Sequence, residues 1–275
     1  MVMKKTFGLI VMVSLLVMSA CSQAQSDEQG AASTIDQVLD KGKLVVGTAP
    51  GYYPFEMKDM NGEFVGYDID VAKAIAEALD VEVEFQQFGF DGLIPALQTG
   101  EIDMILAGMT IRGDRALSVS FSDPYHTTGQ VVMLPKDDTD TKSWEDLDQP
   151  NKKIAVSLGT TGALLAKQIF QEAEILDFED FPSAAMALIQ GEADGVVYDE
   201  PAIRVYEAMH SDSVRGIYDL ISSEELGIAV RHNDLETVQW LNSFLASYLN
   251  SPEQIATYEK WFESSDWMDE VEIED

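Results

Sequence analysis

The stretch Ala96-Leu97-Gln98-Thr99-Gly100-Glu101-Ile102-Asp103 has a counterpart in Ala187-Leu188-Ile189-Gln190-Gly191-Glu192-Ala193-Asp194. Each stretch joins an apolar helical end to a glycine that stops a helix, and an acidic residue then precedes a β-rich run. The two runs end at Ala107-Gly108 and at Tyr198-Asp199. Such a recurrence predicts two similar α/β lobes. The alternative is that helix, glycine and strand form a common local arrangement.

Around the first stretch, short β-rich runs alternate with helical patterns. We expect strands at Leu44 to Gly47, Val81 to Phe85 and Ile102 to Leu106, and helices at Asp68 to Leu79 and from Asp91, as the N-cap, to Gly100. This order predicts a mainly parallel sheet with helices on its faces.

The same alternation follows around the second stretch. We expect strands at Ile154 to Val156 and around Val196-Val197, and helices at Gly162 to Gln171 and Ser183 to Gln190. Extended runs at Gly129 to Pro135 and at Leu226 to Val230 are predicted to cross between the lobes. Ligands bind outside the carboxyl ends of strands in open α/β sheets, so we expect Gly108 and Asp199 to face each other across a cleft.

The C-terminal part is predicted to be helical from Asp234 to Phe262. Its apolar stripe consists of Val238, Leu241, Phe244, Leu245 and Leu249. The acidic stretch that runs on to Asp275 is expected to fray.

The composition excludes several classes of function. The 275 residues include 17 Lys and Arg against 49 Asp and Glu, a formal net charge of −32, which argues against nucleic-acid binding and against a polybasic membrane surface. A hydrophobic fraction of 46% is enough for ordinary cores. One cysteine excludes an intramolecular disulfide and a cysteine metal cluster, and three histidines leave little scope for a histidine metal site. Since the motifs of common cofactor and hydrolase sites are missing, we expect no catalytic residues, no metal and no cofactor.

The N-terminus has the pattern of an export signal. Lys4 and Lys5 precede an uncharged run from Phe7 to Ala20, which is shorter than the roughly 20 residues of a membrane-spanning helix. Because Cys21 follows Ser19-Ala20, the segment resembles a bacterial lipoprotein signal, whose cysteine is lipidated. We therefore expect a signal at residues 1–20 and a flexible tether at residues 21–34. An ordinary signal with an incidental cysteine is the alternative.

Three segments offer groups that suit a small zwitterion. Residues 107–115 provide backbone N–H groups, the Thr110 hydroxyl and guanidinium groups, which together can hold a carboxylate. The turn Gly159-Thr160-Thr161-Gly162 opens a helix, whose N-terminus attracts anions. Asp199 can accept an ammonium group. Each feature also has a purely structural interpretation: a helix cap for the turn, a loop anchor for Asp199 and a solvated loop side chain for Arg112.

Four motifs occur in order along the first half of the chain. They are Gly66-Tyr67-Asp68-Ile69-Asp70, Asp91-Gly92-Leu93-Ile94-Pro95-Ala96-Leu97, the segment Ala107 to Arg115, and Phe121-Ser122-Asp123-Pro124-Tyr125. With these motifs, the run from Leu44 to Met133 resembles the extracellular solute-binding proteins of family 3, the amino-acid receptors of ABC importers. Gly159-Thr160-Thr161 and Asp199 extend the resemblance over nearly the whole mature chain.

The resemblance implies an α/β, two-lobed, periplasmic-binding-protein-like (type II) fold with a ligand cleft between the lobes. Lobe 1 would comprise residues 35–131 and 226–275, and lobe 2 residues 132–225. The family's carboxylate clamp falls on Arg115, Gly108, Thr110 and Thr161, its ammonium acceptor on Asp199, and its aromatic walls on Tyr52 and Phe90. Taken alone, these two aromatic residues would be assigned to the core.

The implied function is extracytoplasmic binding of an α-amino acid and its delivery to a permease and an ATPase, by a monomer that is lipid-anchored to the cell membrane. Ala49 and Ser157 stand where some relatives carry a charge, and this favours an uncharged ligand side chain. The alternatives are an enzyme on the same scaffold, such as a cyclohexadienyl or arogenate dehydratase, and a sensor subunit. The enzyme would need a general acid in the cleft.

Overall fold

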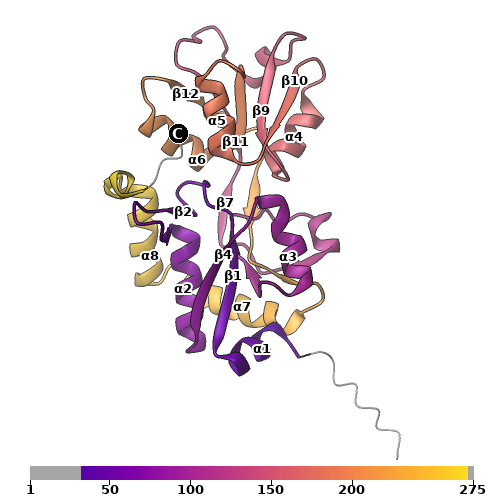
Figure 1. Cartoon of the computed structure of the whole chain (residues 1–275), viewed down its shortest axis with the longest axis vertical. Helices are drawn as coiled ribbons and strands as arrows, with labels where there is room; N and C mark the ends of the chain where they lie inside the picture. Colours follow the sequence, from indigo (N-terminus) through magenta and orange to yellow (C-terminus); the bar gives the residue numbers. More distant parts are fainter. Residues whose placement is uncertain (1–31, 272–275) are drawn as a thin grey trace, which may run out of the picture. The chain divides into compact units, whose positions relative to one another are not determined.

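The structure is a computed structural model that describes residues 32–271. The predicted signal, the lipidation site at Cys21 and residues 21–31 of the predicted tether lie outside the described residues. The described chain forms two five-stranded sheets, each covered by helices on both faces (Figure 1).

The first sheet has the strand order β4-β1-β5-β14-β6. Its strands are β1 (Lys43–Thr48), β4 (Glu82–Gln87), β5 (Met104–Ile105), β6 (Val119–Phe121) and β14 (Ala229–Arg231). Strand β1 pairs in parallel with β4 and β5, whereas β14 runs antiparallel to β5 and β6. We call this sheet with its helices lobe 1. The helices are α1 (Thr34–Lys41), α2 (Tyr67–Leu79), α3 (Leu93–Thr99), α7 (Leu235–Tyr248) and α8 (Pro252–Tyr258).

The second sheet repeats this pattern in the order β10-β9-β11-β8-β12. Its strands are β8 (Gln130–Pro135), β9 (Lys153–Ser157), β10 (Glu174–Phe178), β11 (Gly195–Asp199) and β12 (Val214–Ile217). Three strands are parallel, and β8 runs antiparallel to its neighbours. This sheet forms lobe 2 with α4 (Thr161–Ile169), α5 (Phe181–Ile189) and α6 (Glu200–Met209). The predicted two-lobed α/β fold is confirmed, and both sheets are mixed.

The duplicated stretches have the same local structure in both lobes. Gly100 and Gly191 have positive φ angles of 76° and 77°, which end the helices α3 and α5 before a strand. Asp103 then accepts a hydrogen bond from the backbone N–H of Val45 at 2.7 Å, and Asp194 accepts one from that of Lys153 at 2.9 Å. The repeated aspartate therefore fixes the neighbouring parallel strand in each sheet.

Alternating side chains of the central strands are buried on opposite faces. In β1, Leu44 and Val46 pack with α2, and Val45 packs with α3. Since successive side chains of a strand point to opposite faces, one strand supplies both cores. Three core clusters result, one of which includes side chains from both lobes.

Two short strands, β7 (His126–Thr128) and β13 (Glu224–Leu226), pair with each other in antiparallel fashion, and each stands in the sequence between a strand of one sheet and a strand of the other. Strand β7 precedes β8 of lobe 2, and β13 precedes β14 of lobe 1. The chain therefore passes between the lobes along this pair. A further small hairpin joins β2 (Met57–Lys58) to β3 (Phe64–Val65).

Two local predictions near α3 are wrong. The chain enters α3 through the 3-10 turn η1 (Phe90–Gly92), so the N-cap is Gly92 and the Asp91 side chain makes no cap. The strand predicted at Ile102 to Leu106 pairs only as Met104–Ile105, although all five residues except Asp103 are buried.

The C-terminal helix is interrupted and the tail is packed. Helix α7 ends before Asn250, which has a φ of 64°, and Pro252 starts α8. A π-helical turn (η4, Glu259–Glu263) and a 3-10 turn (η5, Asp266–Glu270) follow. As far as Val271, the predicted tail is packed rather than frayed: Trp267 and Val271 are buried in the core, and Val271 forms a β-bridge with Asp59.

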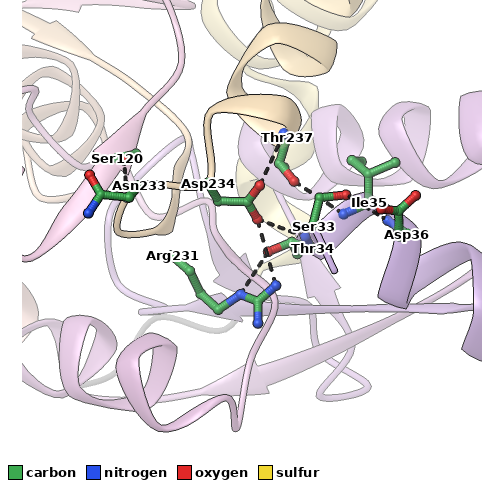
Figure 2. A network of polar contacts seen from close by, with 9 residues as sticks. All are labelled: Ser33, Thr34, Ile35, Asp36, Ser120, Arg231, Asn233, Asp234 and Thr237. Carbon is green, nitrogen blue, oxygen red and sulfur yellow. Dashed lines mark hydrogen bonds and ion pairs between the residues drawn. The ribbon is translucent and has the colours of Figure 1, made fainter. Parts of the chain in front are cut away.

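A polar network ties the first described helix to the C-terminal part of lobe 1 (Figure 2). Asp234, the N-cap of α7, accepts hydrogen bonds from the N–H groups of Thr237 at 3.2 Å and Thr34 at 2.7 Å. Thr237 accepts one from the N–H of Ile35, and Arg231 donates to the Thr34 hydroxyl at 3.0 Å. The start of α1 is thus bonded to the start of α7 in lobe 1.

The remaining short turns are η2 (Arg115–Leu117) and η3 (Trp144–Leu147). Among residues 32–271, no helix is long and apolar enough to span a membrane.

Candidate functional site

The seven predicted site residues come from the carboxyl ends of strands and the turns that follow them. Tyr52 follows β1, Phe90 follows β4, Gly108, Thr110 and Arg115 follow β5, Thr161 begins α4 after β9, and Asp199 ends β11. All are buried except Phe90, which is partly buried.

Arg115 connects the two lobes. Its Nη1 donates to the carbonyl oxygen of Thr110 and its Nη2 to that of Gly159, both at 3.0 Å. The guanidinium carbon lies 5.2 Å from the ring centroid of Phe90, an arrangement that favours a cation. Burial, with the nearby Arg112, lowers the pKa of Arg115 to about 10, so the side chain stays charged at neutral pH.

Two threonine hydroxyls meet between the lobes. Thr110 of lobe 1 and Thr161 of lobe 2 have their Oγ1 atoms 3.3 Å apart. Thr161 is the first residue of α4, whose N-cap Thr160 accepts a hydrogen bond from the N–H of Ala163. The helix N-terminus and the two hydroxyls therefore form a set of donors around one point.

Asp199 is buried and is the N-cap residue of α6, but its side chain accepts no cap hydrogen bond from that helix. Its Oδ2 accepts a hydrogen bond from Gln130 Nε2 at 3.0 Å. Burial, followed by the charge of Glu224, raises the pKa of Asp199 to about 7, although Gln130, Tyr52 and Arg115 oppose this rise. A ligand ammonium group would stabilise the ionised form.

Gly108 allows the ring of Tyr52 to approach the backbone. The residue has a φ of 53°, and a Cβ atom there would lie 2.0 Å from Tyr52 Cε1. The Gly108 N–H donates to Asp68 at 2.8 Å, so this N–H is already engaged. Tyr52 also stacks on Phe55 and meets Tyr198 of lobe 2 edge to face.

Three buried polar residues at the site were absent from the sequence prediction. Gln130, the first residue of β8, has no exposed surface and contacts both Thr161 and Asp199 through Nε2. Glu224, the first residue of β13, is 8% exposed and accepts a hydrogen bond from Thr110. Glu56, just before β2, has no exposed surface. A polar residue at the end of a predicted crossing strand is the signal that points to Gln130.

Glu56 is the most unusual of the three. Neither of its carboxyl oxygens accepts a hydrogen bond from a donor group in residues 32–271. Burial and the neighbouring Asp68 carboxyl raise the pKa of Glu56 well above its usual range. Asp68 itself accepts hydrogen bonds from the Gly108 N–H and the Tyr125 hydroxyl, both at 2.8 Å, but burial raises its pKa to about 7.

The predicted site residues do not line a single cavity. One cavity of about 60 Å³ is bounded by Tyr52, Glu56, Phe90, Ser157 and Tyr198, among others. Another, of about 450 Å³, is bounded by Thr110, Thr161, Ser222 and Glu224, among others. Arg115 and Asp199 bond to protein groups instead. Within the described part of the chain, no group of three or more His, Cys, Asp or Glu side chains is arranged to hold a metal ion.

Residues 44–264 match the family model of bacterial extracellular solute-binding proteins, family 3. The chain belongs to this family. It is 33% identical over 267 residues to a probable histidine-binding protein of Neisseria gonorrhoeae, covering 94% of this chain and 96% of the relative. It is also 30% identical over 269 residues to the ABC transporter glutamine-binding protein of Bacillus subtilis strain 168, covering 94% and 97% of the two chains.

A solved structure supports the fold. The crystal structure of an ancestral amino acid-binding protein, described as a precursor of cyclohexadienyl dehydratase, is 43% identical and aligns with a TM-score of 0.79. The alignment covers 84% of this chain and all of the other. The fold is therefore the two-lobed type II fold of amino-acid-binding proteins, and the family is extracytoplasmic.

Proposed function

We propose that the protein is a receptor that binds one α-amino acid between its lobes and delivers it to the permease and ATPase of an ABC importer. The observation that carries the proposal is the meeting of Arg115 and Thr110 from lobe 1 with Thr161 and Asp199 from lobe 2. A guanidinium and two hydroxyls suit the ligand carboxylate, and a buried aspartate suits its ammonium group.

Closure of the lobes is part of this proposal. Within residues 32–271, the chain crosses between the sheets at β7 and β13 and the segments beside them, so these form a natural hinge. A ligand that contacts both lobes stabilises the closed arrangement by its differential affinity for it. In the described arrangement Arg115 binds the carbonyl of Gly159 across the lobes, and a ligand carboxylate would replace this contact.

The class of ligand side chain follows from Glu56. Ala49 and Ser157 favour an uncharged side chain, but Glu56 lines the cavity beside Tyr52 and Phe90, and its oxygens receive no hydrogen bond from the part of the chain that the structure describes. A buried carboxylate needs donors, which an apolar side chain lacks. We therefore propose a side chain with a positively charged end, and we keep an uncharged amide as the alternative. The names of the relatives include both kinds, histidine and glutamine.

The N-terminal predictions complete the proposal. A lipid on Cys21 would anchor the protein to the outer side of the cell membrane. Residues 21–32 would form the tether, because Ser33 is the N-cap of α1 and Thr34 is its first residue. The two lobes, predicted as residues 35–131 with 226–275 and residues 132–225, would be held as a monomer beside the permease, with the first boundary moved to the start of β8 at Gln130. Metabolic labelling with a palmitate analogue tests this part, because Cys21→Ser should abolish incorporation.

Replacement of Arg115 by alanine tests the binding site. We expect the amino-acid affinity to fall at least about 100-fold, because a charge-assisted pair contributes about 3 kcal/mol when buried. The matched control is Arg112→Ala, which removes an exposed guanidinium bonded to Asp114. Calorimetry measures the affinities, and circular dichroism checks the fold. An unchanged affinity in the Arg115 variant would exclude this residue from the site.

Catalysis by a dehydratase is the second candidate. The observation that favours it is Glu56, since a buried carboxyl with a raised pKa is a potential general acid beside the cavity. The named relatives are binding proteins, so we rank it second. Incubation with a cyclohexadienyl acid and spectroscopic detection of an aromatic product decides between the two candidates.

A further inference from the structure

A chain of hydrogen bonds runs through the donors of the proposed carboxylate site. Gln130 Nε2 donates to Thr161 Oγ1 at 3.3 Å, and the hydroxyls of Thr161 and Thr110 are 3.3 Å apart. Thr110 Oγ1 then donates to Glu224 Oε2 at 2.8 Å. The chain begins on β8 of lobe 2 and ends on β13 of the hinge.

The chemistry of the groups sets the direction of every bond. An ionised carboxylate only accepts, so the single hydroxyl proton of Thr110 points to Glu224. The remaining bond between the hydroxyls must then be donated by Thr161. Successive bonds that point the same way strengthen one another. The Thr110 proton is thus directed to Glu224 and the Thr161 proton to Thr110, so both are engaged within this chain.

Glu224 is held firmly in this position. Its Oε1 accepts a hydrogen bond from the Ser222 hydroxyl at 2.7 Å, and Ser222 in turn accepts one from the Gln130 N–H at 3.0 Å. Glu224 is 8% exposed and pairs with Thr128 across the hinge. The carboxylate is therefore fixed beside the hydroxyls that the proposed function assigns to the ligand.

We infer that Glu224 is an internal competitor for the hydroxyl donors of the carboxylate site, which the ligand carboxylate must displace. The inference rests on the proposed function, because it concerns the same site. Glu224 lowers the affinity for an α-carboxylate, both by occupying Thr110 and by repelling a second negative charge nearby. It thereby sets how strongly the protein prefers an α-carboxylate to an uncharged α-amide.

The test compares two pairs of probes, L-arginine with L-argininamide and L-glutamine with L-glutaminamide. Glu224→Gln keeps the size and an acceptor oxygen but removes the charge. We expect the preference for the acid over the amide to rise about tenfold, through tighter binding of the acid. The reason is that the carboxylates of Glu224 and of the ligand, both next to the Thr110 hydroxyl, repel each other strongly in a buried site. The control Glu236→Gln removes an exposed charge from the first turn of α7, outside the cavity of Thr110 and Glu224, and should leave the preference unchanged.

The outcomes separate this inference from the proposed function. An unchanged preference in the Glu224 variant, or an equal loss of affinity for acid and amide, overturns the inference, because a merely structural role would affect both probes alike. A wild-type chain that binds neither amino acid overturns the proposed function and the inference with it. The melting temperature of each unliganded variant identifies any loss of fold.

Discussion

Replacement of Glu56 by glutamine removes a buried carboxyl group that can ionise against a cationic ligand, and leaves a side chain of the same size. Because the Glu56 oxygens receive no hydrogen bond in the described chain, a cationic ligand end would supply their first donors. A hydrogen bond to a charged group contributes about 1.5–3 kcal/mol, which corresponds to roughly 10- to 150-fold in affinity. We expect the affinity for L-arginine to fall by this factor and that for L-glutamine to change about threefold or less.

The pH dependence gives a second measurement on the same residue. Burial and Asp68 raise the pKa of Glu56, so the unliganded protein holds a proton there that a cationic ligand would expel. The affinity for L-arginine should therefore increase with pH, and the heat of binding should depend on the ionisation enthalpy of the buffer. Both effects should disappear in Glu56→Gln.

Calorimetry of wild type, Glu56→Gln and Glu63→Gln completes the experiment. Glu63 is an exposed carboxylate just before β3, so its replacement controls for the loss of one charge. Equal affinities for L-arginine in wild type and Glu56→Gln would refute the assignment of Glu56 to the ligand side chain. The uncharged ligand favoured by Ala49 and Ser157 would then be the better proposal.

Three further predictions concern stability. Asp234→Ala should lower the free energy of unfolding by about 1 kcal/mol or more, as measured in urea, because it removes the N-cap of α7 and the acceptor for Thr34. Although burial alone would raise the pKa of Asp234, the hydrogen bonds from Thr34 and Thr237 hold it below its usual range. The stability that ionised Asp234 contributes is therefore present above about pH 4 and is lost as the pH falls through the lower pKa of the folded state. A difference in unfolding free energy between wild type and Asp234→Asn that grows toward acid pH contradicts the assignment. Trp267→Ala should lower the free energy of unfolding by about 3–5 kcal/mol, since the indole is 5% exposed and packs on Trp261. A decrease below about 1 kcal/mol would mean that this part of the tail does not belong to the core. The net charge of −32 predicts that the melting temperature rises when salt increases from about 0.1 to 1 M, because repulsion is screened, and a flat dependence removes charge repulsion as a determinant of stability.

The pattern of the sequence was sufficient to predict the architecture. The duplicated helix, glycine and strand pattern encodes the same local structure twice, because Asp103 and Asp194 each bind the backbone of a neighbouring strand. Element ends were harder to predict. The helix predicted from Asp234 to Phe262 breaks at Asn250, an exposed residue with a left-handed backbone, and Ser251 and Pro252 begin the next helix, so the apolar periodicity alone did not reveal the break.

The site was predicted only in part. Arg115 and Asp199 lie in motifs whose order along the chain points to one family, so their proximity could be expected. Glu56 and Glu224 carry no such signal, because an acidic residue in a chain with 49 of them is uninformative until burial sets it apart. Long-range pairing, such as that of Gln130 with Asp199, depends on how β8 and β11 align, which short patterns do not encode.

A thermal-shift panel of the twenty amino acids with the mature protein tests the central claim most directly. A ligand present at 100 times its dissociation constant adds about 2.7 kcal/mol to the apparent stability. We predict a clear rise in melting temperature with at least one amino acid, largest for one with a positively charged side chain, and no such rise in Arg115→Ala. A melting temperature that no amino acid raises would contradict the assignment of this protein as an amino-acid receptor.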